Sequence, residues 1–326
     1  MEKLLKNYFV DNLKVLLIFL VVFGHLIERY IDTNITLMGI YLFIYSFHMP
    51  LFIFISGFLS KNINKSKKIF FKNLLIPYIV LNIIWYSLAY IYIGKTNLPI
   101  IYPGWTLWFL LSLFFWRISL RYLIKIKYIL PISFILGILV GLVPNGSFLS
   151  FSRTIFFLPY FLLGYYCDLN KLKKLKKLNK LNNLIALIGI LGFIFLGIYI
   201  AKHNILDYKF LYGSYSYKEL KFNVSTGMIY RSILYIISIL LSCLICILTP
   251  KVKTFYSNMA KSTMYIYVFH IYVILAIFYF IPTWDKNIVT KSIVILSPIL
   301  VTYLLSNKIF EKIYNTLFYY FYKLIK

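Results

Sequence analysis

Charged residues and cysteines are scarce in this chain. Only 13% of its 326 residues are charged and three are cysteine, whereas 61% are hydrophobic. A soluble core cannot bury so much apolar surface, and several apolar runs reach the length of a bilayer span. The composition therefore excludes a soluble globular protein. It predicts an all-α fold, a polytopic bundle of transmembrane helices.

Several motifs that carry known chemistry are also missing. The sequence contains no glycine-rich phosphate loop, no HExxH pair and no two carboxylates at metal-site spacing, so no metal is expected. Cys243 and Cys246 form a CxxC spacing inside an apolar run. Without the βαβ pattern of a redox motif, this spacing indicates packing rather than thiol chemistry.

Acidic residues are few as well. Nine Asp and Glu stand against 35 Lys and Arg, which gives a formal net charge of +26. In a soluble protein this charge would indicate nucleic acid, but here the lysines flank apolar runs, so no nucleic-acid partner is expected. The basic run at 171–183 is expected to lie beside anionic lipid headgroups. No cleavage site follows the first apolar run, which is expected to be retained.

Ten apolar runs are expected to cross the bilayer. Their predicted ranges are 8–29, 37–59, 74–93, 105–124, 128–143, 152–169, 183–201, 229–249, 262–281 and 289–310. The gaps on the side of the N-terminus then hold 24 Lys and Arg, against ten on the opposite side. This excess predicts a single integral domain over 1–326 with both termini cytoplasmic and the segment 202–228 external.

Polar side chains recur at helical spacing in the first run. They are Asp11, Lys14, His25 and Glu28, and their intervals place them on one face of an α-helix. Ionisable residues inside a span are by default candidates for a functional site. Lys14 lies three turns before His25, about 16 Å along the axis. Glu28 is placed either to orient His25 as a general base or to lie beside Arg29 at the outer interface.

Two further histidines lie in later runs. His48 precedes Pro50, whose missing N–H leaves a free carbonyl or a kink. His48 is expected either to line a cavity at that kink or to pack inside the helix. His270, in the ninth run, is expected to pack or to pair near Tyr267.

Six motifs taken in order resemble the acyltransferase 3 family, with fucose 4-O-acetylase-like members the most similar. They are GH at 24–25, FHMPLFIFISGF at 47–58, KSKKIFFKNLLIPY at 65–78, WTLWFLLSLFF at 105–115, FFLPYFLLGYY at 156–166 and STMYIYVFH at 262–270. The resemblance covers residues 10–310. It implies membrane-embedded transfer of an acyl group, usually acetyl from cytoplasmic acetyl-CoA, to a hydroxyl of a cell-envelope polysaccharide or glycolipid. Lys14 and Lys72 depart from the family pattern, in which arginine is frequent; lysine keeps the charge but loses bidentate phosphate contact.

Basic and aromatic side chains outside the first run fit this interpretation. Lys67, Lys68 and Lys72 suit the phosphates of CoA, or serve only as topology signals. Arg153 binds an anionic acceptor or transition state, or snorkels to the interface. Trp108 belongs to the pocket or to an interfacial aromatic belt.

The resulting hypothesis is an O-acyltransferase of the cytoplasmic (inner or plasma) membrane. His25 acts as base on the acceptor hydroxyl or carries the acyl group transiently, and Glu28 orients it. Lys14 offers positive charge to the acyl-CoA or to the developing oxyanion, while His48, Arg153 and Trp108 complete the pocket. The donor is acetyl-CoA or another acyl-CoA.

Two other functions fit parts of the sequence. A transporter or a flippase for a lipid-linked sugar also has intramembrane charges and broken helices. Against it, no inverted repeat is visible, and the ionisable residues concentrate in the first run beside a histidine. A purely structural membrane subunit leaves that stripe of polar residues unexplained.

Overall fold

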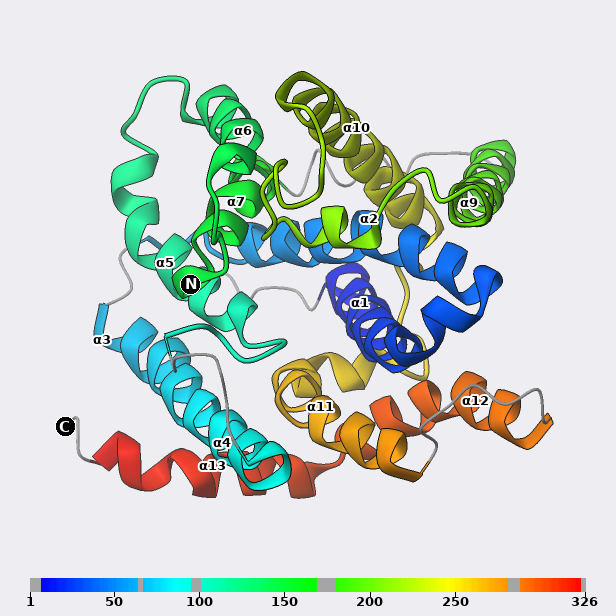
Figure 1. Ribbon diagram of the computed structural model, residues 1–326. Helices are drawn as coiled ribbons and strands as arrows, with labels where there is room; N and C mark the ends of the chain where they lie inside the picture. The colour runs from blue at the N-terminus through cyan, green and yellow to red at the C-terminus, as the bar shows by residue number, and fades with distance from the viewer. Residues whose placement is uncertain (1–6, 64–66, 95–100, 169–179, 281–287, 324–326) are drawn as a thin grey trace. The chain divides into compact units, whose positions relative to one another are not determined.

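The computed structural model describes residues 7–63, 67–94, 101–168, 180–280 and 288–323 (Figure 1). Helices account for 81% of the described residues, which form no strand. Several of the helices are long and apolar enough to cross a membrane. The prediction of an all-α, multi-pass membrane protein is therefore confirmed.

Two compact units divide the chain between them. The first consists of Met1–Phe52, Leu169–Leu206 and Ile236–Thr316, and the second of Ile53–Asp168, Asp207–Tyr235 and Leu317–Lys326. Three helices contribute residues to both units: α2 (Ile35–Phe58), α10 (Val224–Leu248) and α13 (Lys308–Lys323). The single domain expected over 1–326 stays a prediction.

The first unit is organised around its first helix. Its remaining elements are α1 (Tyr8–Ile27), η1 (Glu28–Thr33), α9 (Lys180–Lys202), η6 (Ser257–Ser262), α11 (Thr263–Phe280) and α12 (Ile288–Leu305). α1 packs against η6, α11 and α12. Leu13, Leu17 and Ile18 are fully buried in this packing. Because these apolar positions lie between the polar ones, α1 presents both kinds of side chain to the interior of the unit.

Glycines allow two helices of the first unit to approach closely. A Cβ at Gly39 of α2 would collide with the backbone of Ile198 in α9, and a Cβ at Gly197 would collide with the Gly39 carbonyl. Small residues at such crossings let helix backbones pack directly inside a membrane.

The second unit consists mainly of shorter elements. They are α3 (Lys67–Phe70), the π-helix η2 (Phe71–Leu75), α4 (Ile76–Ile93), α5 (Trp108–Leu123), α6 (Ile129–Leu139), η3 (Val140–Leu142), η4 (Phe148–Ser150), α7 (Phe151–Tyr166) and η5 (Tyr208–Tyr212). α7 packs against both α5 and α6, and α5 packs against α3 and η2.

Two of the six sequence motifs meet in the second unit. A Cβ at Gly57, in the SGF of the second motif, would collide with the Phe161 carbonyl of α7. A Cβ at Gly164, in the LLGYY of the fifth motif, would collide with the Phe54 carbonyl. The two glycines therefore permit a backbone-to-backbone crossing that any larger residue would disrupt.

Among the described residues, fewer helices than the ten expected are long and apolar enough to cross a membrane. Seven described helical stretches are long and apolar enough to cross, and the bent pair Ser292–Leu305 and Lys308–Tyr319, at 62°, brings the number to at most eight. The helices expected at 105–124 and 128–143 exist as α5 and α6, but α5 has 16 residues and α6 has 11. Sixteen residues extend about 24 Å, less than the roughly 30 Å of a bilayer core. Ten spans and cytoplasmic termini stay predictions, and most of the basic run at 171–183 lies outside the described residues.

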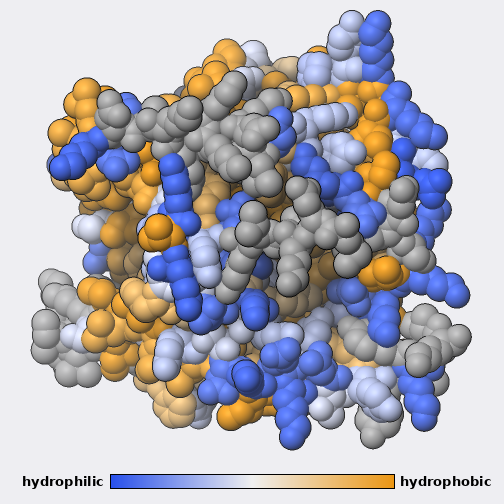
Figure 2. All heavy atoms as spheres, turned by 180° about the vertical axis from the view of Figure 1, so that it is seen from behind, coloured by the Kyte–Doolittle hydropathy of each residue, from blue (hydrophilic) through white to orange (hydrophobic). Residues whose placement is uncertain are grey.

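Large apolar side chains are exposed on several helices, as expected for surfaces that face lipid. Figure 2 shows hydrophobic residues at the surface beside hydrophilic ones. α9 is the clearest case, with Ile188, Phe195 and Tyr199 each more than half exposed. An apolar helix that buries so little of itself against protein is suited to contact with hydrocarbon.

Candidate active site

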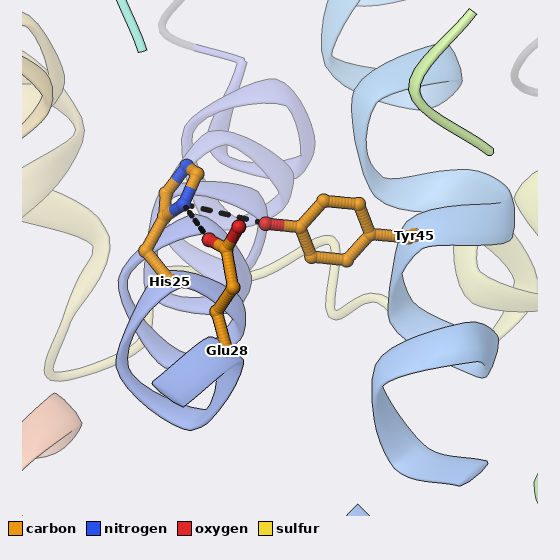
Figure 3. Close-up of polar contacts among 3 residues, drawn as sticks. All are labelled: His25, Glu28 and Tyr45. Atoms are coloured by element: carbon orange, nitrogen blue, oxygen red, sulfur yellow. Dashed lines mark hydrogen bonds and ion pairs between the residues drawn. The ribbon is translucent and has the colours of Figure 1, made fainter. Parts of the chain in front are cut away.

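The last turn of α1 brings His25 and Glu28 together. Glu28 opens the 3-10 helix that continues α1, so it stays on the same face as His25. His25 Nδ1 lies 3.1 Å from Glu28 Oε2 (Figure 3). The two side chains are 14% and 24% exposed, so both are largely removed from solvent. The structure has the contact between Glu28 and His25, and the orienting role of Glu28 stays a prediction.

This contact fixes the protonation pattern of the imidazole. An ionised carboxylate can only accept a hydrogen bond, so Nδ1 of His25 is the donor. In the neutral ring the lone pair then resides on Nε2. A carboxylate that holds one ring nitrogen in this way orients the other for proton abstraction, which is the arrangement that a general base requires.

Tyr45 of α2 is a third member of the site that the sequence analysis missed. Its hydroxyl lies 3.3 Å from the same Nδ1 atom of His25 (Figure 3). Because Nδ1 carries one proton, the Tyr45 oxygen is a second acceptor, weaker than the closer carboxylate. The Tyr45 ring also meets the His48 ring edge-on, with centroids 4.7 Å apart. The three-residue spacing of Tyr45 and His48 was the available signal, since it places both on one helix face.

His48 is bonded within its own helix. It is 2% exposed, and its Nδ1 donates to the Ile44 carbonyl at 2.7 Å. Pro50 lies inside α2 and supplies no N–H to the Ser46 carbonyl. That carbonyl instead accepts a hydrogen bond from Ser238 Oγ of α10 at 2.5 Å. The free carbonyl expected from Pro50 is therefore present, and His48 packs inside the helix.

His270 of α11 lies next to His25, with ring centroids 5.5 Å apart. It is fully buried, and its Nδ1 donates to the carbonyls of Tyr267 at 2.7 Å and Ile266 at 3.1 Å. Its Nε2 has no hydrogen-bond partner within the described part of the chain. The sequence indicated that His270 packs or pairs near Tyr267. Proximity to His25 carried no sequence signal, because it depends on the packing of α11 against α1.

The start of α1 is hydrogen-bonded to the segment 250–260, far along the sequence. Lys14 Nζ donates to the Ala260 carbonyl of η6 at 2.7 Å. The amide of Asn12, fully buried, donates to the carbonyls of Pro250 and Val252 at 3.0 and 2.9 Å. Its oxygen accepts from the Ser257 hydroxyl at 2.6 Å. Lys14 is thus held by protein backbone, three turns before His25.

In the second unit the structure brings Arg153 and Trp108 together. The Arg153 guanidinium lies 5.1 Å from the centre of the Trp108 ring, which stacks on Phe157 at 5.2 Å. Arg153 Nε donates to the Tyr212 carbonyl at 3.2 Å. The sequence analysis had grouped these two residues as pocket components, and here they form one cation–π pair.

Arg231, which the sequence analysis did not select, is 1% exposed in the same unit. Its guanidinium lies 4.9 Å from the Tyr217 ring and 5.0 Å from the Phe156 ring, and its terminal nitrogens donate to the carbonyls of Gly137 and Tyr215, each at 3.4 Å. Burial raises the pKa of the Tyr217 hydroxyl, although Arg231 opposes the shift. Tyr217 therefore stays neutral and donates to the Ile138 carbonyl at 2.7 Å. Aromatic faces and carbonyls, rather than an anion, surround this cation.

The three lysines expected to bind CoA lie on neighbouring short elements. Lys67 and Lys68 are exposed on α3, and Lys72 is half-buried in the π-helix η2. Lys67 Nζ lies 5.8 Å from the centre of the Tyr122 ring. Within the described residues, no group of three or more His, Cys, Asp or Glu could hold a metal ion.

Comparison with known proteins gives one result that spans the chain. A family model described as an acyltransferase domain matches residues 7–307. No curated protein and no solved structure matches. The matched region contains all six motifs, the His25 site and both arginine sites.

Proposed function

The chain belongs to the acyltransferase 3 family, and from this premise we propose that it is an O-acyltransferase with acyl-CoA as donor. The acyl group is acetyl, and the acceptor is a hydroxyl of a cell-envelope polysaccharide or glycolipid. The reaction takes place in the cytoplasmic membrane. The observation that carries the proposal is the contact between His25 and Glu28, because it leaves a lone pair on Nε2 of an oriented imidazole.

The proposed reaction uses that lone pair as a base. Nε2 of His25 takes the proton of the acceptor hydroxyl while the hydroxyl oxygen attacks the thioester carbonyl. The C–S bond then breaks, the ester forms, and the departing CoA thiolate takes the proton back from the imidazolium. Glu28 stabilises the imidazolium between these two transfers, since its carboxylate lies 3.1 Å from Nδ1.

Basic residues bind the substrates in this proposal. Lys67, Lys68 and Lys72 contact the phosphates of CoA. Lys14 lies about 16 Å from His25 along α1, too far to reach an oxyanion formed there, so its charge serves the donor instead. Arg153, held over Trp108, binds an anionic group of the acceptor. His48 supports the site through its ring contact with Tyr45.

Purified protein in nanodiscs, labelled acetyl-CoA and an envelope glycan extract test the proposal. We expect label to appear in glycan with release of free CoA, and His25→Ala to abolish both while the protein stays in the membrane. A transporter or flippase would consume no thioester, so an intact acetyl-CoA pool with folded wild-type protein would refute the proposed function. Label that stays on wild-type protein in the absence of glycan would identify acyl-histidine transfer in place of direct base catalysis.

A further inference from the structure

Arg117 of α5 faces the short elements that carry the three lysines. α5 packs against α3 and η2 within the second unit. The rings of Phe71 and Phe114 meet at 5.0 Å, and the Arg117 guanidinium lies 5.8 Å from the centre of the Phe70 ring. Further along α5, the ring of Tyr122 makes a cation–π contact with Lys67 Nζ. Arg117 therefore belongs to the same basic cluster as the lysines of α3 and η2.

The guanidinium of Arg117 has a donor without a partner among the described residues. Its Nε atom is buried and has no hydrogen-bond partner among the described residues, and the contact with Phe70 is a ring contact only. A guanidinium carries five N–H donors and is always charged. The Nε of Arg231 is likewise buried without a partner among the described residues, but both terminal nitrogens of Arg231 bond to backbone carbonyls. Among the residues that the structure describes, Arg117 makes no such bond.

The surrounding sequence offers Arg117 no counter-ion. Between residues 33 and 167 the chain contains no Asp or Glu. The charged neighbours on α3, η2 and α5 are all basic: Lys67, Lys68, Lys72 and Arg121. A half-buried cation among other cations, with a donor that no described residue accepts, is suited to bind an anion from outside the chain. Lys72 also lies in a π-helical segment, a distortion that occurs frequently at functional sites.

We infer that Arg117 binds a phosphate group of the acyl-CoA donor together with the lysines of α3 and η2. The inference rests on the proposed function, since it takes CoA as the donor. The lysines supply point charges, whereas the planar guanidinium supplies a bidentate fork that matches a phosphate. Arg117 thereby fixes the orientation of the nucleotide part of CoA. Phosphates of membrane lipids share this chemistry, so the experiment must separate the two sources.

The test uses the full chain in nanodiscs of zwitterionic lipid, with acetyl-CoA and S-acetyl-pantetheine as alternative donors. S-acetyl-pantetheine carries the thioester but lacks the phosphates. We expect Arg117→Gln to raise the KM for acetyl-CoA about tenfold, with kcat and the KM for S-acetyl-pantetheine within twofold of wild type. The KM of Arg117→Lys for acetyl-CoA should lie between those of wild type and Arg117→Gln. Arg121→Gln, an exposed arginine one turn away on the same helix, is the matched control and should leave both donors within twofold.

Three outcomes would overturn the inference. The first is an unchanged KM for acetyl-CoA in Arg117→Gln. The second is an equal rise for both donors. The third is an effect of Arg117→Gln that appears only when anionic lipid is added to the nanodiscs, which assigns the arginine to a lipid headgroup. If Arg117→Gln fails to insert, Arg117→Lys carries the same comparison of donors. Failure of the proposed function is separate, because wild-type protein would then consume neither donor.

Discussion

The two units accommodate polar groups in different ways. Around His25 the first unit gathers imidazoles, a carboxylate and a phenol, whose hydrogen bonds run to one another or to backbone carbonyls. Around Arg153 and Arg231 the second unit gathers aromatic rings and carbonyls. An imidazole can be neutral in a low-dielectric interior, whereas a guanidinium is always charged and must be compensated. The first arrangement is suited to moving a proton, whereas the second compensates a fixed positive charge.

A second contrast lies within the first unit. His25 bonds through Nδ1 to a carboxylate, while His48 and His270 bond through Nδ1 to backbone carbonyls. All three rings therefore have the same tautomer. Only His25 has a negative charge at hydrogen-bond distance, so only its imidazolium is directly stabilised when it takes a proton. This difference distinguishes the proposed base from its two neighbours.

The largest effect is expected at His25. His25→Gln keeps the size and some hydrogen bonding of the side chain but cannot take a proton, so turnover per folded molecule should fall at least about 100-fold. His203→Gln, at an exposed histidine outside this site, is the control and should match wild type. Retention of more than about a tenth of wild-type turnover by His25→Gln would move the role of base to His48.

The second-largest loss of activity is expected from a substitution at Glu28. Glu28→Gln keeps an oxygen that can accept from Nδ1 but removes the charge that stabilises the imidazolium. Hydrogen bonds to charged groups are worth about 1.5–3 kcal/mol, so kcat should fall about 10–100-fold with the donor KM unchanged. Single-turnover rates measured against pH test this. If kcat of Glu28→Gln equals that of wild type, the carboxylate lies beside His25 without stabilising its imidazolium.

The lysines of α3 and η2 should affect binding alone. Replacing Lys67, Lys68 and Lys72 together by Gln should raise the apparent KM for acetyl-CoA about tenfold and weaken its salt dependence, because each exposed pair contributes up to about 1 kcal/mol. The acceptor KM should hardly change. Unchanged donor kinetics in a stably inserted triple variant would leave these lysines as topology signals only.

Tyr45 should show the smallest change. Its hydroxyl is the weaker partner of His25 Nδ1, and a typical hydrogen bond contributes about 1 kcal/mol, so Tyr45→Phe should reduce kcat about fivefold. The comparison with Glu28→Gln is decisive for the ranking of the two partners. A larger loss in Tyr45→Phe than in Glu28→Gln would mean that the phenol, rather than the carboxylate, orients the base.

Local sequence patterns account for much of this structure. The intervals between Asp11, Lys14, His25 and Glu28 predicted one helix face, and the three-residue step from His25 to Glu28 gave their contact. Pro50 predicted a free carbonyl or a kink, and in the structure the Ser46 carbonyl bonds outside its own helix, to Ser238. These features depend on residues within one or two helical turns, where backbone geometry leaves few alternatives.

Features that depend on tertiary packing could not be predicted in this way. The approach of His270 to His25 joins α11 to α1, and Ser238 reaches Ser46 across 192 residues of sequence. Some helix boundaries also differ from the predicted ones. Tyr128 has a left-handed backbone, with φ of 60°, immediately before α6, so that helix cannot extend backwards. An apolar run by itself does not reveal such a break.

The hydrogen bonds of Asn12 affect the order in which the protein folds during synthesis. Asn12 is bonded to carbonyls that follow it by 238 and 240 residues, and Lys14 to one that follows it by 246. Chains grow at about 5–20 residues per second, so these partners emerge about 10–50 s after α1. During that interval the helix that carries His25 lacks the partners of two of its polar side chains. The helix that carries His25 is therefore completed only after residues 250–260 have been synthesised.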